Sequence, residues 1–311
     1  MKPMNRVGVD RCQRRAVVAL GASLVACAIA MGTASHAQAT MASYTSGFAR
    51  FSRTSDTIQV LGNTQFGATY GPLQPGTGDF TYDMHIRISP GFSDSRIISE
   101  QRNTWEDKSL RISSNGDYWF SGVSEGGTGV VQGNMTLPTD AWIHLAYVKQ
   151  GTAASIYVNG IRVANHTPDF QYGDPSDSWM SIGMHRDGVG YPGSGYPVRP
   201  SFIGDLDWIR VSSGALYTAN FVPPTESAVA ATASTQLLYK FNEAAGTSTI
   251  YDESSNAFQG NLGVAVYPGV TATAPTLMTG TVPGPGALVT MALGVMTSRR
   301  RRRGSSRLAD D

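Results

Sequence analysis

Residues 142–160, WIHLAYVKQGTAASIYVNG, carry the clearest hydrophobic pattern in the chain. Ile143, Leu145 and Tyr147 alternate with residues that are also largely apolar, so we expect this strand to be buried on both faces. A second alternating run follows Gly151 and ends in Asn159-Gly160, a pair that tolerates the positive φ angles of a type I′ hairpin turn. The pattern therefore predicts a β-hairpin in the core of a β-sandwich.

Short alternating runs recur along most of the chain. The longest is Asp79 to Ile88, which alternates strictly and ends at Pro90-Gly91. Others are expected at 48–51, 57–60, 96–101, 108–113, 118–121, 129–135, 179–185 and 201–211, with a turn at Asn115-Gly116. Few stretches show a helical period, and 35 Gly and 16 Pro residues punctuate the runs. These features predict an all-β protein with two antiparallel sheets.

Two segments resemble the laminin-G-like modules of the concanavalin A-like jelly-roll superfamily. The first is Trp142-x-His144-x-Ala146, followed by a glycine and Ile156-Tyr157-Val158-Asn159-Gly160. The second is Gly204-Asp205-Leu206-Asp207 with Arg210 at the end of its strand, followed by Leu216-Tyr217-Thr218 and Phe221-x-Pro223. Gly78-Asp79-Phe80-Thr81 is also similar to the start of a long strand in that family. The resemblance implies a jelly-roll domain over residues 40–273.

The segment from Leu237 to Asn256 resembles one that often opens such modules, yet here it follows the closing one. Because a jelly roll keeps its termini close together, the segment could dock in the usual place from the other end of the chain. The alternative is a truncated second module. However, the residues from Leu237 to Thr273 are too few to bury a sandwich core of their own.

The N-terminal residues 1–39 have the features of a secretory signal peptide. A positive region from Lys2 to Arg15 precedes an apolar run from Ala16 to Ala34, and Ala37-Gln38-Ala39 offers a small-x-small cleavage site. The alternatives are a retained membrane anchor and lipoprotein processing, since Leu24-Val25-Ala26-Cys27 resembles a lipobox. Cys12 and Cys27 are the only cysteines, so cleavage after Ala39 leaves a domain without thiols or disulfides.

The C-terminal residues 282–311 resemble the PEP-CTERM sorting signal of Gram-negative bacteria. Val282-Pro283-Gly284-Pro285-Gly286 precedes an apolar run, Ala287 to Met296, and an arginine run, Arg299 to Arg303. The apolar run predicts a short helix, below the roughly 20 residues of an ordinary membrane span. The resemblance implies transient membrane contact, processing by an exosortase, and delivery to the cell surface or extracellular matrix. Residues 274–281 are then expected to be a linker, and a disordered basic tail is the alternative.

Charge argues against nucleic acid as a partner. The whole chain has 24 Lys and Arg against 23 Asp and Glu. Without residues 1–40 and 299–311, 13 basic residues face 20 acidic ones, a net charge of −7. An acidic domain has no electrostatic reason to bind a polyanion such as DNA.

The carboxylates do not match those of a glycoside hydrolase. Retaining enzymes of the jelly-roll superfamily need two carboxylates about 5 Å apart, which means Glu-x-Asp-x-x-Glu or a close variant on one strand. None of the six glutamates (Glu100, Glu106, Glu125, Glu226, Glu243, Glu253) has these neighbours. The sequence also lacks a Gly-x-Ser-x-Gly elbow, a His-Glu-x-x-His motif and a phosphate loop. We therefore expect a protein that is not an enzyme, with a divergent hydrolase or lyase as a lesser alternative.

Calcium is the cofactor that the resemblance implies. Related jelly rolls use an aspartate at the place of Asp207 for a structural calcium ion, and Asp205 lies two residues before it. Ligation by oxygen alone suits calcium in a domain without cysteine. The alternative is that both aspartates are solvated or paired with Arg210 or Arg162. Asp252 and Asn256 are more remote candidates for the metal.

Candidate sugar-binding residues are aromatic side chains with polar neighbours. The segment 186–200 is rich in Gly, Pro and Tyr and is too long for a tight connection, which favours a functional loop. We predict ligand-binding residues Trp179, Asp187, Tyr191, Tyr196 and Arg199, whereas Trp142, Trp208 and His144 are expected in the core. The resulting hypothesis is a secreted, non-catalytic module that binds a surface glycan or matrix component, with a structural matrix protein that binds other proteins as the alternative.

Overall fold

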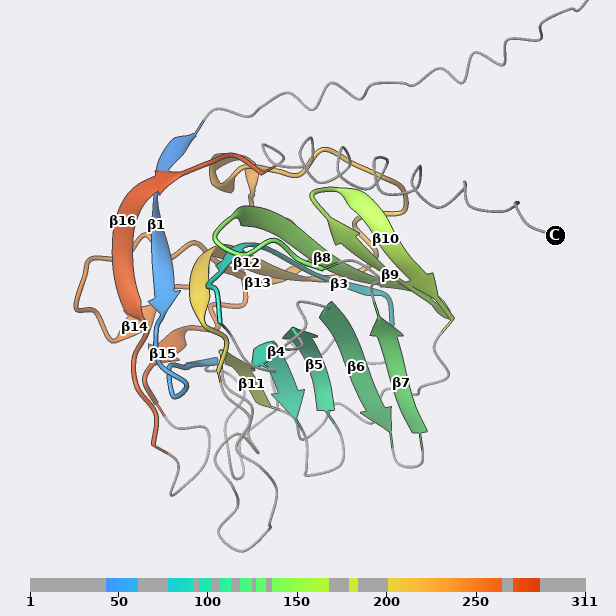
Figure 1. Cartoon of the computed structure of the whole chain (residues 1–311), viewed down its shortest axis with the longest axis horizontal. Coiled ribbons are helices and arrows are strands. Elements are labelled where there is room, and N and C mark those ends of the chain that lie inside the picture. Colours follow the sequence, from blue (N-terminus) through green and yellow to red (C-terminus); the bar gives the residue numbers. More distant parts are fainter. Residues whose placement is uncertain are drawn as a thin grey trace, which may run out of the picture. The chain divides into compact units, whose positions relative to one another are not determined.

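Two antiparallel β-sheets enclose one hydrophobic core in the computed structural model of the chain (Figure 1). The structure describes residues 43–60, 78–91, 95–101, 107–112, 118–124, 127–132, 136–167, 179–183, 201–264 and 271–285. All of them belong to the unit Gln38–Asp311. The predicted all-β class and antiparallel sandwich are confirmed. The predicted signal peptide and C-terminal helix lie outside the described residues.

Sixteen described strands form the two sheets. The first sheet has the order β10 (Ile161–His166), β9 (Ala153–Val158), β8 (Trp142–Gln150), β3 (Phe80–Ile88), β12 (Gly204–Ser213), β1 (Tyr44–Phe51) and β16 (Thr276–Val282), with β13 (Thr235–Tyr239) also paired to β12. The second sheet has the order β14 (Thr249–Ile250), β15 (Gly260–Leu262), β2 (Ile58–Val60), β11 (Trp179–Ile182), β4 (Ser95–Gln101), β5 (Asp107–Ile112), β6 (Tyr118–Ser124) and β7 (Gly127–Gln132).

Strand alternation directs one face of each sheet into the core. In β3, Phe80, Tyr82, Met84, Ile86 and Ile88 are fully buried in the main cluster, together with Ile98 and Leu110 from the second sheet. Burial of one such side chain contributes about 1.5–3 kcal/mol. The alternate residues of β3, among them Asp83 and His85, lie on the outer face and are also buried. A second, polar layer therefore lies outside the first sheet.

The predicted hairpins at residues 142–160 are present. Gly151 has φ +56° between β8 and β9, and Asn159 and Gly160 have φ +49° and +75° between β9 and β10. A Cβ atom at Gly160 would lie 1.9 Å from the carbonyl oxygen of Phe221. The amide of Phe221 also donates to the carbonyl of Gly160 at 3.0 Å. The turn therefore requires glycine both for its φ angle and for the close approach of the chain near Phe221.

The segment after the closing strand adds strands to both sheets of the same sandwich. Leu237 and Tyr239 of β13 pair with Val211 and Ile209 of β12. Gly260 and Leu262 of β15 pair with Val60 and Ile58 of β2. Because these strands complete existing sheets, the segment does not form a separate module.

The structure differs from the predicted linker at 274–281. Strand β16 covers Thr276–Val282 and pairs with β1 over seven residues, from Tyr44↔Val282 to Arg50↔Thr276 (Figure 1). Leu277 joins the main core and Val282 is fully buried. Threonine and glycine made this stretch look like a linker, but Leu277, Met278 and Val282 supply the contacts of an edge strand. No helix among the described residues is long and apolar enough to cross a membrane.

Candidate functional site

Four of the predicted ligand-binding residues, Asp187, Tyr191, Tyr196 and Arg199, lie outside the described residues. The structure does describe Gly183 and Ser201, the residues before and after this part of the chain. The amide of Gly183 donates to the carbonyl of Ile97 at 2.8 Å, and Ser201 forms a parallel bridge with Arg96. Both ends of the segment therefore meet the start of β4. Trp179, the fifth candidate, is the first residue of β11 and pairs in register with Gln101 of β4.

The outer face of the second sheet next to Trp179 is polar. Ser181, Ser99 and Ser109 lie side by side in register on β11, β4 and β5. All three are buried, with exposed fractions of 2% or less. The Nε atoms of Arg96 and Arg111 each donate to the Ser109 hydroxyl at 3.1 Å. Because the three serines and Arg96 are buried, this row is a polar layer inside the domain.

The first aspartate of the predicted calcium site, Asp205, is held by two arginines. Arg50 donates from Nε to Oδ1 at 2.8 Å and from Nη2 to Oδ2 at 3.2 Å. Arg87 donates from Nε to Oδ2 at 2.9 Å and also from Nη2 to Oδ2. Both carboxylate oxygens therefore face positive charge, which does not fit a calcium ligand. The partners are Arg50 and Arg87, not Arg210 or Arg162.

The second aspartate, Asp207, is the extra residue of a β-bulge between Leu206 and Trp208. Its Oδ2 accepts a hydrogen bond from the Tyr44 hydroxyl and lies 2.9 Å from Nδ1 of His85. Burial, and then the charge and hydrogen bond of Asp207, raise the pKa of Tyr44 far above its ordinary value. The Tyr44 hydroxyl therefore stays protonated and donates.

These surroundings do not fit calcium. The ion takes six to eight oxygen ligands at roughly 2.3–2.6 Å, whereas Asp207 has an imidazole and a phenol as neighbours. Within the described ranges, no three His, Cys, Asp or Glu side chains are grouped for a metal ion. The remoter candidate Asp252 accepts from the amides of Leu238, Ser254 and Phe258 at 2.8–2.9 Å. Asn256 donates from its side-chain amide to the carbonyl of Gln236 at 3.0 Å. Asp252 and Asn256 therefore hold the turn at residues 252–258 against Gln236 and Leu238.

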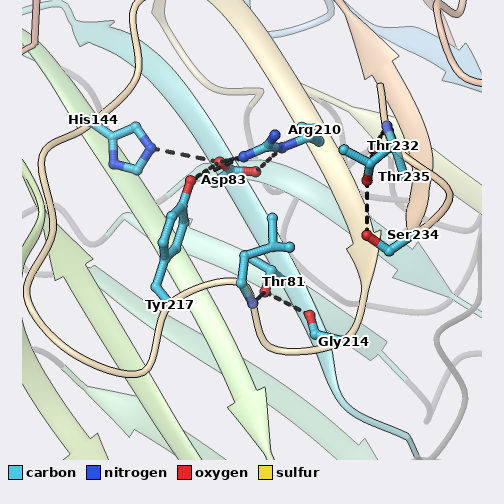
Figure 2. A network of polar contacts seen from close by, with 10 residues as sticks. Thr81, Asp83, His144, Arg210, Gly214, Tyr217, Thr232, Ser234 and Thr235 are labelled. Atoms are coloured by element: carbon cyan, nitrogen blue, oxygen red, sulfur yellow. Dashed lines mark hydrogen bonds and ion pairs between the residues drawn. The ribbon is translucent and has the colours of Figure 1, made fainter. Parts of the chain in front are cut away.

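A buried polar cluster is centred on Asp83 in the outer layer of the first sheet. Arg210 donates from Nε to Oδ1 at 3.1 Å and from Nη2 to Oδ2 at 2.8 Å, and the Tyr217 hydroxyl donates to Oδ2 at 2.8 Å. Nε2 of His144 lies 3.7 Å from Oδ2. Figure 2 shows His144, Arg210 and Tyr217 pointing at this one carboxylate. His144 lies on β8 and Arg210 on β12, whereas Tyr217 lies on the segment after β12 that also contains Phe221, here called the covering segment.

The protonation states in this cluster follow from burial and charge. Burial alone would raise the pKa of Asp83, but the nearby His144 and Arg210 outweigh it and hold the pKa below the ordinary value of 3.8. Burial lowers the pKa of His144 below 6.5, against the opposing attraction of Asp83. Burial and the Asp83 charge raise the pKa of Tyr217 well above its ordinary range. At neutral pH, Asp83 is therefore ionised while His144 and Tyr217 are neutral.

A covering segment seals this cluster from solvent. Tyr217 and Phe221 stack with ring centroids 3.6 Å apart and an interplanar angle of 5°, and the Tyr157 hydroxyl donates to the Tyr217 carbonyl at 3.2 Å. His144 is fully buried, as predicted for a core residue, although its nearest carboxylate lies beyond hydrogen-bond length. Asp83 and His144 are fully buried beneath this segment, while the Arg210 side chain is 11% exposed.

At one end of the first sheet, arginines lie over aromatic rings. The guanidinium carbon of Arg50 lies 5.5 Å from the ring centre of Phe48, and that of Arg87 lies 5.4 Å from Trp142. Trp142 and Trp208 are buried as predicted, with 7% and 0% exposed, but they lie in the outer layer, not between the sheets. The sequence interpretation missed Arg50 and Arg87. The only local signal was their position on the polar side of alternating strands, which does not show that both face Asp205.

A sequence-family model described as the concanavalin A-like lectin/glucanases superfamily (Laminin_G_3) matches residues 61–220, slightly more than half of the chain. No curated protein sequence matches the chain.

Solved structures give partial matches. A Bacteroides ovatus protein described as carbohydrate-binding is 20% identical, with 74% of this chain and 61% of that chain covered and a TM-score of 0.47. The chain thus spans less than two thirds of that protein's length. Domains LG4-5 of mouse laminin α1 are 14% identical, with 59% and 49% covered and a TM-score of 0.40. Domain 4 of a Geobacillus stearothermophilus arabinanase, solved with arabinotriose, is 16% identical, with 55% and 84% covered and a TM-score of 0.40.

Proposed function

The chain belongs to the concanavalin A-like lectin/glucanases superfamily, and from this premise we propose that it is a non-catalytic module that binds glycans. The superfamily's description covers proteins that bind sugars and proteins that cleave them. The carboxylates distinguish the two activities, because retaining and inverting glycosidases both need a pair of Asp or Glu residues that can act on the glycosidic bond.

The observation that carries the proposal is that the buried carboxylates of the described sheets and turns have fixed structural partners. Asp83, Asp205 and Asp207 are held by the arginine, histidine and tyrosine side chains described above. Asp56 accepts from the amides of Ser52 and Arg53 at 2.7 and 2.9 Å, and Asp252 accepts from three amides. A general acid needs a raised pKa and access to the glycosidic oxygen. Asp83 has neither.

Candidate groups for stacking on a sugar lie instead beside the second sheet. Trp179 is the first residue of β11, the strand that also holds the buried Ser181. The described residues that flank the predicted ligand loop, Gly183 and Ser201, contact Ile97 and Arg96 at the start of β4. Aromatic rings that stack on sugar rings, with hydroxyl and guanidinium groups alongside, are sufficient for recognition without catalysis.

Affinity electrophoresis combined with a reducing-end assay tests this proposal. The purified full chain is run through native gels that contain one polysaccharide each, and the same polysaccharides are assayed for new reducing ends after incubation. We expect retardation by at least one polysaccharide and no release of reducing ends. Release of reducing ends that scales with protein concentration would show an enzyme and contradict the proposal.

We also propose that the module acts outside the cell, at the cell surface or in the extracellular matrix. The signal-peptide features of residues 1–39 and the Pro-Gly, apolar and arginine order of residues 282–311 support this location. Processing by an exosortase after transient membrane contact would remove the tail. Mass spectrometry of the mature termini tests both signals: termini near Thr40 and near Val282 are expected, whereas an intact N- or C-terminus would refute the corresponding signal.

A further inference from the structure

We propose that Arg50 and Arg87 form an anion subsite that binds the carboxylate or sulfate group of an acidic glycan. This inference rests on the proposed glycan-binding function and names the ligand class. It concerns the outer face of the first sheet.

The subsite is a straight row across five strands. Trp142, Arg87, Asp205, Arg50 and Thr276 are directly opposite one another on β8, β3, β12, β1 and β16. Neighbouring side chains in such a row start about 4.5–5.5 Å apart. The two arginines therefore flank Asp205 from either side at one end of the sheet.

Both guanidinium groups are locked in place. Each uses Nε and Nη2 to bind Asp205, and each lies over an aromatic ring, Phe48 for Arg50 and Trp142 for Arg87. The rings lie edge to face, with centroids 5.7 Å apart and an interplanar angle of 76°. This packing removes the rotamer freedom that a free surface arginine loses when it binds a ligand.

Both arginine side chains are partly exposed to solvent. The side chain of Arg50 is 39% exposed and that of Arg87 is 32% exposed, while Asp205 between them is 3% exposed. No described residue pairs with the Nη1 atom of either arginine. Two Nη1 groups thus offer N–H donors at the surface, next to the exposed Thr276 on the adjoining strand.

The charge balance favours an anion. One guanidinium is enough to neutralise Asp205, so the second can pair with an anionic group of the ligand. This local pairing acts against the net charge of −7 of the chain between the two terminal segments, which disfavours polyanions in general. Charge-assisted hydrogen bonds from arginine to carboxylate or sulfate oxygens are about twice as strong as neutral ones. A neutral sugar would use none of this charge.

Matched polysaccharides test the subsite. The full chain is titrated with polygalacturonate, alginate and chondroitin sulfate, and each is compared with its carboxyl-reduced or desulfated form. We expect at least one acidic form to bind about tenfold more tightly than its neutral counterpart. Arg50→Gln and Arg87→Gln should each reduce that affinity about tenfold and leave binding of neutral glycans unchanged. Arg50→Lys, which keeps the charge but loses the bidentate fork, should give an intermediate loss.

Arg53→Gln is the matched control, because Arg53 is 57% exposed near the same end of β1 and its one ion pair with a described residue is to Asp56, at 3.6 Å. Arg53→Gln should bind glycans as the wild type does. The thermal unfolding midpoint of each variant shows whether that variant is folded. Equal binding of the acidic and neutral forms, or wild-type binding by folded Arg50→Gln and Arg87→Gln, would overturn the subsite while glycan binding itself would stand. Failure to bind any glycan, acidic or neutral, would overturn both proposals.

Discussion

Asp83 and Arg210 lie opposite each other on β3 and β12 and form two parallel hydrogen bonds of 3.1 and 2.8 Å on the outer face of the first sheet. The Asp83 side chain is fully buried and that of Arg210 is 11% exposed. The pair explains how a polar strand face can be covered by the segment around Tyr217 and Phe221.

Asp83→Asn is expected to lower the free energy of unfolding by about 3–5 kcal/mol, because it leaves Arg210 buried without a counter-charge. Urea denaturation at neutral pH measures the effect. Arg53→Gln removes a 57% exposed arginine whose buried partner Asp56 keeps its hydrogen bonds from the amides of Ser52 and Arg53, so it should cost less than about 1 kcal/mol. If Asp83→Asn cost no more than this control, the structural role of the pair would be refuted.

Stability should fall as the solution becomes acidic, in two steps. The pKa of His144 is lowered by burial, so the unfolded chain binds a proton below pH 6.5 that the folded chain binds only at lower pH. The same sign holds for Asp83 below pH 3.8, since its pKa is also lowered in the folded state. Urea midpoints are therefore expected to be flat above pH 7 and to decrease below 6.5.

His144→Gln should flatten the upper step, whereas His166→Gln, at an exposed position on β10, should keep it. The measurement is the urea midpoint between pH 7.5 and pH 5. A His144→Gln protein with the same slope as the wild type would show that another group causes the acid sensitivity.

Gly160→Ala is expected to destabilise the domain more than Gly151→Ala. Both glycines have positive φ, which costs an L-residue about 1–2 kcal/mol. A Cβ at Gly151 meets nothing within 4 Å, while one at Gly160 meets the Phe221 carbonyl at 1.9 Å. The clash should add about 1–3 kcal/mol and increase hydrogen exchange at the Phe221 amide. Equal losses in the two variants would contradict the packing of this segment on the turn.

A protein that ends at Thr273 should be less stable than one that ends at Pro285, because only the longer one contains β16. Truncation removes the buried Leu277 and Val282 and uncovers the hydrogen-bonding edge of β1. Burial of two such side chains contributes about 3–6 kcal/mol. Urea unfolding and size-exclusion chromatography of residues 40–273 and 40–285 compare the two. Equal stability would restore residues 274–281 as a linker.

Local sequence patterns predicted the strands well, because alternation and turn residues act over a few positions. The Asn159-Gly160 turn was predicted from two residues, and the strand expected at 79–88 is observed at Phe80–Ile88. The same alternation was a poor guide to exposure. Asp83 and His85 stand at polar positions but are buried. Tyr217, 134 positions later in the chain, donates a hydrogen bond to Asp83, and the His85 ring lies 5.1 Å from that of Trp142.

The site residues depend on strand pairings that no local pattern encodes. Arg50 and Asp205 are separated by 155 positions, and Arg87 and Asp205 by 118. A reader of the sequence can see that Asp205 is near the start of a strand, but not that two arginines meet it there. The calcium hypothesis arose from this limit, because the family resemblance supplied an aspartate without its neighbours.

A glycan array probed with the purified full chain, in calcium and in EDTA, tests the central claim most directly. We predict binding to at least one class of glycan, with the same signal in both buffers, because the described aspartates are held by protein side chains and not arranged around a metal ion. Absence of binding to every glycan in both buffers would contradict the claim that this chain is a glycan-binding module.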